Sequence, residues 1–361
     1  MTVMLLVGLV VYDLFAYLAF AINGDSLGSV FGAFGFFPFD GLRFDSLFAT
    51  AAYWIGVGLG VLALMLGFFA VAAINIEAVR GNRFMSPRLA FRFALQRLPQ
   101  IFLSELSIAL FIAFIVLLFA VLGLISRIPF LGEWLYTLLF AVPNFIIAFF
   151  AIFIIFVLSL TVLLLPAVAA AERRGETFTA ILETFSTIIL QPFRWFGYTV
   201  YSLVAAKVCG FIFAYFAYRA VEFLVWSSSI GGGERLPRLV ESALAHLPVR
   251  SALVREVFNI FPGVSFGVPL WQYAGYPSRA AITHFMAVML FLIFAAVLGY
   301  GLAIVAAAQA RGYVVLRFKK DEYNIAAEKP LFFTDEPVNE PVEGAGPDAD
   351  ASSRPSPPSG E

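Results

Sequence analysis

Six long apolar runs constrain this chain more than any other feature of its sequence. They cover residues 3–22, 47–76, 101–125, 134–166, 197–226 and 281–307, and each reaches the roughly 20 apolar residues that cross a bilayer as one helix. Hydrophobic residues make up 61% of the sequence and charged residues only 13%, well below the roughly 25% charged residues of soluble domains. The sequence therefore predicts an all-α, polytopic membrane helix bundle with about six transmembrane helices plus interfacial amphipathic helices.

The first apolar run superficially resembles a secretory signal. It carries Asp13 in mid-run, lacks basic residues before it and exceeds the 7–15 apolar residues typical of a signal sequence. We expect this run to stay attached as the first span.

The chain divides into a membrane part and a tail. Residues 1–320 are predicted to form one integral membrane domain, with an outer loop at 227–280 that opens on the flexible stretch Ser227 to Gly233. Two amphipathic segments, 236–247 and 249–261, follow in that loop. From Asp321 onward Pro, Glu, Asp, Ser and Gly dominate, and this composition buries too little apolar surface to fold. Residues 321–361 are therefore predicted to be a disordered, acidic, Pro/Ser-rich cytoplasmic tail.

The distribution of Lys and Arg predicts the orientation in the membrane. Fourteen of these residues fall on the side that contains both termini, and seven fall on the other side. Basic loops stay preferentially in the cytoplasm. We expect a multi-pass protein of the bacterial plasma (inner) membrane with both termini in the cytoplasm.

A short phrase of small residues followed by Arg-Gly recurs at the ends of three apolar runs. Its copies run from 71 to 81, from 168 to 175 and from 305 to 312. An arginine near a helix C-terminus satisfies free carbonyls, and a glycine permits the left-handed turn that ends a helix. The sequence predicts a repeated cytoplasmic exit motif, made of Glu77, Gly81, Glu172, Gly175, Gln309 and Gly312.

An amphipathic segment follows each of the first two exits. Residues 86–98 begin with Ser86, a good helix cap, and residues 177–189 place apolar side chains opposite Glu183, Thr184 and Thr187. Both are predicted to be helices in the cytoplasmic interface. Basic residues are dense around the first segment, and membrane lipids are their expected partners. The predicted lipid-binding residues are Arg83, Arg88, Arg92 and Arg97.

This succession of apolar helix, small-residue exit, interfacial helix and apolar helix resembles a group of bacterial multi-pass proteins. Its matching residues are Pro166, Ala167, Glu172, Gly175, Ala180 and Ser186, with a weaker echo at Glu77, Gly81, Ser86 and Ala90 and a hairpin turn at 128–132. The group includes the membrane domain of some glycerophosphodiester phosphodiesterases and related families of unknown function. The likeness covers about residues 47–320. The catalytic domain of those phosphodiesterases is absent, so the resemblance implies the membrane fold and no hydrolase activity.

No arrangement of catalytic residues is visible in the sequence. His246 and His284 have no Cys or paired carboxylate at ligand spacing, and Cys209 stands alone in an apolar run. Gly231 to Gly233 lacks the lysine of a phosphate-binding loop. The sequence predicts a protein without enzymatic activity, metal or cofactor, and its acidic tail argues against nucleic-acid binding.

Asp13 and Lys207 are the ionisable residues that the sequence places deep within the spans. A charge at the centre of a membrane helix costs about 2.5–3.5 kcal/mol, so each side chain should find a partner. Both residues stand about ten positions from the cytoplasmic start of their span. We expect the first and fifth spans to be neighbours, with Asp13 and Lys207 forming an intramembrane polar pair.

Three functions fit these features. The favoured one is transport or handling of a hydrophobic or lipid-like molecule. A second is a permease-like subunit coupled to a cytoplasmic ATPase, with a protein partner docking at residues 167–196. A third is a structural scaffold that organises membrane partners.

Overall fold

Six long helices dominate the structure, a computed structural model that describes residues 1–34, 38, 42–124, 128, 132, 134, 137–138, 143–173, 175–244, 246–247 and 281–332. The helices long and apolar enough to cross a membrane are α1 (Thr2–Asn23), α3 (Leu47–Val79), α5 (Leu98–Leu124), α7 (Phe145–Ala171), α9 (Pro192–Gly232) and α12 (Ala281–Asp321). No strand occurs in the ranges given above. The predicted all-α fold is confirmed, and the protein is an integral, multi-pass membrane protein.

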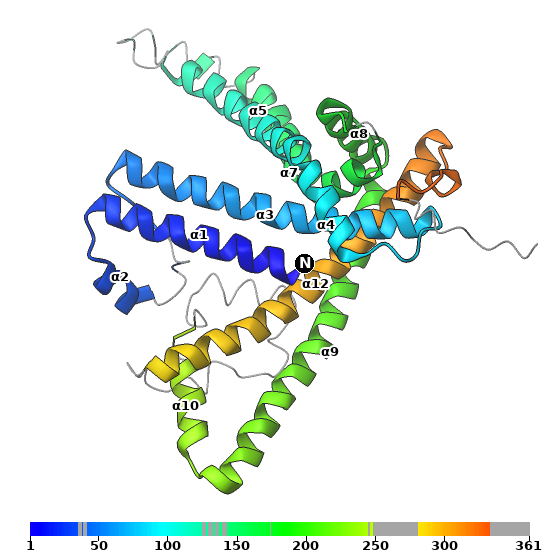
Figure 1. The fold of residues 1–361 in the computed structure, drawn as a ribbon. Helices are drawn as coiled ribbons and strands as arrows, with labels where there is room; N and C mark the ends of the chain where they lie inside the picture. The colour runs from blue at the N-terminus through cyan, green and yellow to red at the C-terminus, as the bar shows by residue number, and fades with distance from the viewer. Residues whose placement is uncertain are drawn as a thin grey trace, which may run out of the picture.

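The spans meet at one end and diverge toward the other (Figure 1). We call the meeting place the junction end: there α3, α7 and α12 end, α5 and α9 begin, and α1 starts at the N-terminus. Two shorter helices, α4 (Pro87–Gln96) and α8 (Thr177–Leu190), also lie at this end. At the opposite, splayed end, α2 (Leu27–Phe34) follows α1, and α10 (Arg235–Leu244) bridges the gap between α9 and α12.

The main hydrophobic core lies at the junction end. Its fully buried members include Phe69 and Ile76 of α3, Leu164 of α7 and Leu316 of α12. Away from this core, the spans expose large apolar side chains such as Phe114 and Phe153, as lipid-facing surfaces do. The largest buried core therefore joins the spans at the junction end, whereas α1 and α3 stay packed together as far as Ala19 and Ala49 near the splayed end.

Glycines let α1 lie directly against α3. A Cβ added to Gly56 would stand 2.4 Å from the Cβ of Phe15, and one added to Gly8 would stand 2.9 Å from the Gly60 carbonyl oxygen. Close backbone approach through small residues is a common way for membrane helices to associate. Gly56 and Gly60 thus serve packing within this chain.

The two amphipathic helices predicted after the exits are present. Ser86 caps α4, with its hydroxyl accepting a hydrogen bond from the Leu89 amide at 3.2 Å. Glu176 precedes α8, which runs to Leu190. In the outer loop, α10 corresponds to the predicted segment 236–247, whereas the segment 249–261 lies outside the described residues.

The third exit motif does not end a helix, contrary to prediction. Helix α12 continues without interruption through Gln309 and Gly312 to Asp321. The extension buries Tyr313 and Leu316 in the junction core, and this burial favours a continued helix over a turn. Similarly, Ser227 to Gly232, predicted to be flexible, form the last turns of α9, and only Gly233, with φ of 61°, ends it.

The ordered part of the chain extends beyond residue 321, where the disordered tail was predicted to begin. A short 3₁₀ helix follows α12 at Ile325–Ala327, and Ile325 is buried in the junction core. Leu331 and Phe332 pack against the same core. The boundary at residue 321 is therefore wrong, because these apolar side chains fold back onto the helix ends. Residues 333–361 lie outside the described residues.

The first two exits turn as predicted, on glycines with positive φ. Gly81 has φ of 105° and Gly175 has φ of 77°. The surroundings of the two glycines differ: a Cβ on Gly81 would meet nothing within 4 Å, whereas one on Gly175 would lie 1.5 Å from Nη1 of Arg97. Gly175 is therefore required for the close approach of Arg97 as well as for the turn.

Alanine substitutions should separate these two requirements. Gly81→Ala is expected to lower the free energy of unfolding by about 1–2 kcal/mol, the cost of left-handed backbone in a residue with a Cβ. Gly175→Ala should lose a further 1.5–3 kcal/mol, roughly the worth of the charge-assisted hydrogen bond that a displaced Arg97 gives up. Denaturant titration of the purified protein in mixed micelles measures the free energy of unfolding of each variant. Equal decreases in the two variants would contradict the close contact between Gly175 and Arg97.

Candidate functional site

A buried arginine joins three parts of the chain at the junction end. The Arg80 guanidinium contacts Oε1 of Glu77 at 3.0 Å and Oε2 of Glu328 at 2.6 Å. It also donates to the carbonyl oxygen of Ala171, the last residue of α7, at 2.8 Å. Both Arg80 and Glu77 are shielded from solvent. One side chain thus links the end of α3, the end of α7 and the segment after α12.

The segment 325–332, which we call the C-terminal clasp, is fixed through its backbone as well. Oε2 of Glu77 accepts from the Leu331 amide at 3.0 Å, and the Asn82 side chain donates to the Phe332 carbonyl at 2.7 Å. Arg173 donates to Glu328 at 3.0 Å. The exit residues therefore bind the chain's own C-terminal region.

The polar residues of the other two motifs make different connections. Oε2 of Glu172 accepts from the side chain of Gln100 at 3.2 Å and from the Glu176 amide at 2.8 Å. Gln309 is buried and donates to the Thr199 hydroxyl at 3.0 Å. Each motif supplies one polar side chain that joins its helix to a neighbour, which is a structural role.

Helix α8 turns its polar face toward the bundle. Glu183 forms ion pairs with Arg317 and with Lys320, the latter at 2.7 Å. Burial favours a raised pKa for Glu183, but hydrogen bonds from Arg317 and Lys320 outweigh it and lower the pKa. The outward face carries exposed apolar side chains, Phe178, Leu182 and Leu190 among them. An amphipathic helix of this orientation suits contact with lipid.

The predicted lipid-binding arginines separate into two groups. Arg83, Arg88 and Arg92 are exposed, as a lipid-contacting role requires. Arg97 is half-buried: it donates to the Arg173 carbonyl at 2.6 Å and lies over the Phe93 ring, 5.4 Å from the centroid. The turn after α7 engages its guanidinium, which gives Arg97 a structural contact, and its role in lipid binding stays a prediction.

The predicted pairing of Asp13 with Lys207 is not observed. Helix α1 packs against α3 and α12, whereas α9 packs mainly against α12, so the first and fifth spans are not packed neighbours. Oδ1 of Asp13 is buried without a hydrogen-bond partner in the part of the chain that the structure describes. A second buried carboxylate, which the sequence pattern does not single out, belongs to Glu105 of α5, and its Oε1 also has no hydrogen-bond partner among the described residues.

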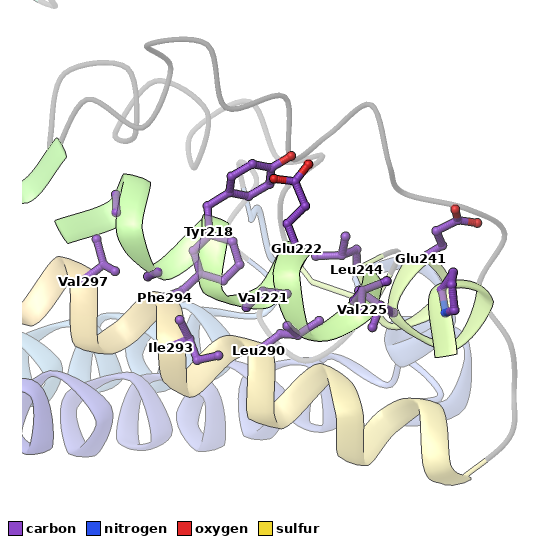
Figure 2. Close-up of a pocket in the computed structure, with 14 residues that line it drawn as sticks. Tyr218, Val221, Glu222, Val225, Glu241, Leu244, Leu290, Ile293, Phe294 and Val297 are labelled. Carbon is purple, nitrogen blue, oxygen red and sulfur yellow. The ribbon is translucent and has the colours of Figure 1, made fainter. Parts of the chain in front are cut away.

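A cavity of about 270 Å³ lies between α9, α10 and α12 toward the splayed end (Figure 2). Figure 2 shows side chains from all three helices around it. Its lining residues are Ala214, Ala217, Tyr218, Val221, Glu222, Val225, Pro237, Val240, Glu241, Leu244, Leu290, Ile293, Phe294 and Val297.

The walls of this cavity are almost entirely apolar. Ala214 and Ala217 leave room where α9 begins to diverge from α12, and α10 closes the gap with Val240 and Leu244. The charged lining residues are two carboxylates, Glu222 and Glu241, both exposed. Arg219 forms an ion pair with Glu222 at 2.5 Å. This arrangement suits a ligand with an apolar body, and with Glu222 paired to Arg219 the negative charge at its rim comes from Glu241.

The structure brings His246 and His284 together, a contact that their separation in sequence does not predict. Their ring centroids are 4.4 Å apart, and the contact joins the end of α10 to the beginning of α12. Because His284 follows His246 by 38 positions in sequence, only the return of α10 toward α12 places them side by side. Among the described residues, no group of three or more His, Cys, Asp or Glu side chains is placed to hold a metal.

Comparison with known proteins leaves the cavity as the main guide to function. Neither a family model, nor a curated protein, nor a solved structure matches this chain. The resemblance to the membrane domain of glycerophosphodiester phosphodiesterases stays a prediction.

The clasp should respond to acid through Glu328. Burial favours a raised pKa for this carboxyl, but hydrogen bonds from Tyr323 and Arg173 and the charge of Arg80 outweigh it and lower the pKa below the ordinary 4.5. Its contribution to clasp binding is therefore complete above pH 4.5 and lost as the pH falls through the lower pKa of the folded state. Amide hydrogen exchange of residues 325–332, corrected for intrinsic rates, should show protection that disappears only in that acidic window.

Substitution of Glu328 tests the same contact, and substitution of Glu322 supplies the control. Glu328→Gln should expose the clasp amides at neutral pH and remove the acid-induced step. Glu322→Gln, the same change at an exposed position six residues earlier, should leave both unaltered. Retained protection in Glu328→Gln would show that the ion pairs do not hold the clasp.

Proposed function

We propose that this protein binds a hydrophobic or lipid-like molecule in the cavity between α9, α10 and α12 and moves or presents it within the membrane. The observation that supports this proposal most is the apolar cavity itself, enclosed by two spans and a bridging helix. No bond-making step is part of the proposed role.

The size and lining of the cavity support an amphiphile. Ligand pockets commonly enclose about 300–1,000 Å³ and are mostly apolar with a few polar groups. The cavity, at about 270 Å³, would hold part of a molecule such as one end of an acyl chain. Since its charged lining groups are the carboxylates of Glu222 and Glu241, the bound molecule would carry a neutral or cationic head.

Helix α10 would act as the movable wall. It follows Gly233, whose φ of 61° and ψ of −144° mark a break in the chain direction. Its packing rests on a small cluster, with Ala243, Leu244 and Leu247 against Ala287 and Leu290 of α12. A small contact of this kind can open at lower cost than the junction core.

The cavity favours ligand handling over a purely structural scaffold, because a scaffold needs no space for a ligand. The permease-like alternative assigns partner docking to Glu172 and α8. Glu172 and the polar face of α8 are already engaged in contacts within the bundle. These contacts leave the apolar face of α8 for lipid.

Filling the cavity should remove the bound molecule. Ala217→Phe places a ring where α9 lines the cavity, and mass spectrometry of lipid extracted from purified protein should show at least a tenfold fall in the retained species. The matched control is Leu224→Phe on the same helix, where the side chain is 60% exposed to the lipid side. The proposal fails if folded Ala217→Phe protein retains as much of the species as the control.

We further propose that the junction end faces the cytoplasm of a bacterium, on the strength of the bias in Lys and Arg. In a Cys209→Ser background, a cysteine replacing Ser86 at the junction end should react with an impermeant thiol reagent only after the membrane is opened. A cysteine replacing Ser26, in the turn after α1, should react in intact cells. The reverse pattern would invert the proposed orientation.

A further inference from the structure

A second hollow separates α9 from α12 at the junction end, on a surface that the proposed function does not use. It is an open groove of about 900 Å³. From α9 it is lined by Phe193, Arg194, Gly197, Tyr198, Tyr201 and Ala205. From α12 it is lined by Ile304, Ala307, Ala308, Arg311, Gly312, Val315, Leu316 and Lys319. We call it the basic groove.

Small residues create the space between the two helices. Ala307, Ala308 and Gly312 of α12 and Gly197 and Ala205 of α9 are among its lining residues, and a Cβ added to Gly197 would meet nothing within 4 Å. The buried hydrogen bond from Gln309 to Thr199 fixes the two helices together next to the groove. The hollow is therefore built into a rigid helix pair.

Three cations line the groove and none has an ion-pair partner among the described residues. Arg194, Arg311 and Lys319 are all exposed, and no carboxylate lines the groove with them. The nearby Arg317 and Lys320, by contrast, are both paired with Glu183. Eight residues separate Arg311 from Lys319, which is about 12 Å along a helix. The positive charge thus extends along one side of the groove.

Aromatic side chains accompany the cations. Tyr198 and Tyr201 line the same groove and are exposed, with an apolar ring and a polar hydroxyl each. Tyrosines of this kind are enriched at the level of lipid headgroups. Farther along the spans, Ala205 and Ile304 continue the groove as an apolar surface. The arrangement matches a molecule with an anionic head and an apolar chain.

We propose that the basic groove is a binding site for an anionic phospholipid. Its phosphate would lie between Arg194, Arg311 and Lys319, and an acyl chain would follow the small residues toward Ile304. Each cation near an anionic headgroup strengthens binding about fivefold. The site differs in charge from the cavity at the splayed end, whose lining carries carboxylates, and it does not depend on the function proposed for that cavity.

The test uses the full chain in nanodiscs that contain phosphatidylcholine with a minor fraction of phosphatidylglycerol. Native mass spectrometry after release counts the phosphatidylglycerol that each variant retains. The triple variant Arg194→Gln, Arg311→Gln, Lys319→Gln should lose affinity about 100-fold, from three losses of about fivefold each. The control triple Arg43→Gln, Arg235→Gln, Arg238→Gln makes the same charge change at three exposed positions of the splayed end and should retain the lipid.

A second variant separates shape from charge. Gly197→Leu keeps all three cations and fills the groove, so it should also release phosphatidylglycerol. Circular dichroism and size exclusion identify the variants that remain folded. Equal loss in the control triple, or equal retention of phosphatidylcholine and phosphatidylglycerol, would overturn the proposal. Displacement of the lipid by millimolar inorganic phosphate would overturn it as well, because the site would then recognise a free anion.

Discussion

The buried guanidinium of Arg80 is the interaction on which the arrangement of the spans depends. Removing a charge from water costs several kcal/mol unless partners replace the lost hydration. Here Glu77 and Glu328 supply opposite charge, and the Ala171 carbonyl adds a further acceptor. These three partners come from α3, from the clasp and from α7. The cost of burying Arg80 is offset only when all three segments have met at the junction end.

The position of this cluster explains the shape of the molecule. The largest core and the buried ion pairs hold the spans together at the junction end, whereas smaller apolar clusters at the splayed end join α1 to α3 and α10 to α9 and α12. Helix α12 contacts α1, α3, α7, α9 and α10, so it connects the two ends. Its divergence from α9 creates the apolar cavity near α10, and the small residues on the same helix pair create the basic groove near the junction.

The spans and the first two turns follow from local sequence. Run length and hydrophobicity identify a membrane helix without knowledge of its neighbours, and a glycine after an arginine at a helix end indicates a left-handed turn. The third motif does not end its helix, because Tyr313 and Leu316, which follow it in sequence, are buried against distant helices and favour a continued helix. The sequence does contain a feature that predicts the clasp, because Ile325, Leu331 and Phe332 are large apolar residues in an otherwise polar tail.

The candidate sites depend on relations that one sequence does not contain. Asp13 and Lys207 were matched by depth, but depth in a membrane does not determine which helices are neighbours. Arg97 was grouped with three other arginines by composition, although a turn 76 residues away engages it. The cavity requires the angle between α9 and α12 and the return of α10. Such angles arise from packing over the whole bundle and have no local pattern.

We infer that the spans are fixed at the junction end and that α9 can move relative to α3 at the splayed end. Electron paramagnetic resonance distances between spin-label pairs test it directly, in a Cys209→Ser background. Labels at Ser86, the residue that caps α4, and at Thr179 of α8 should give one narrow distance distribution. Labels at Ala51 and Ile230, at the splayed ends of α3 and α9, should give a broad distribution that narrows when the cavity ligand is added. A broad distribution at the junction end together with a narrow one at the splayed end would contradict the claim.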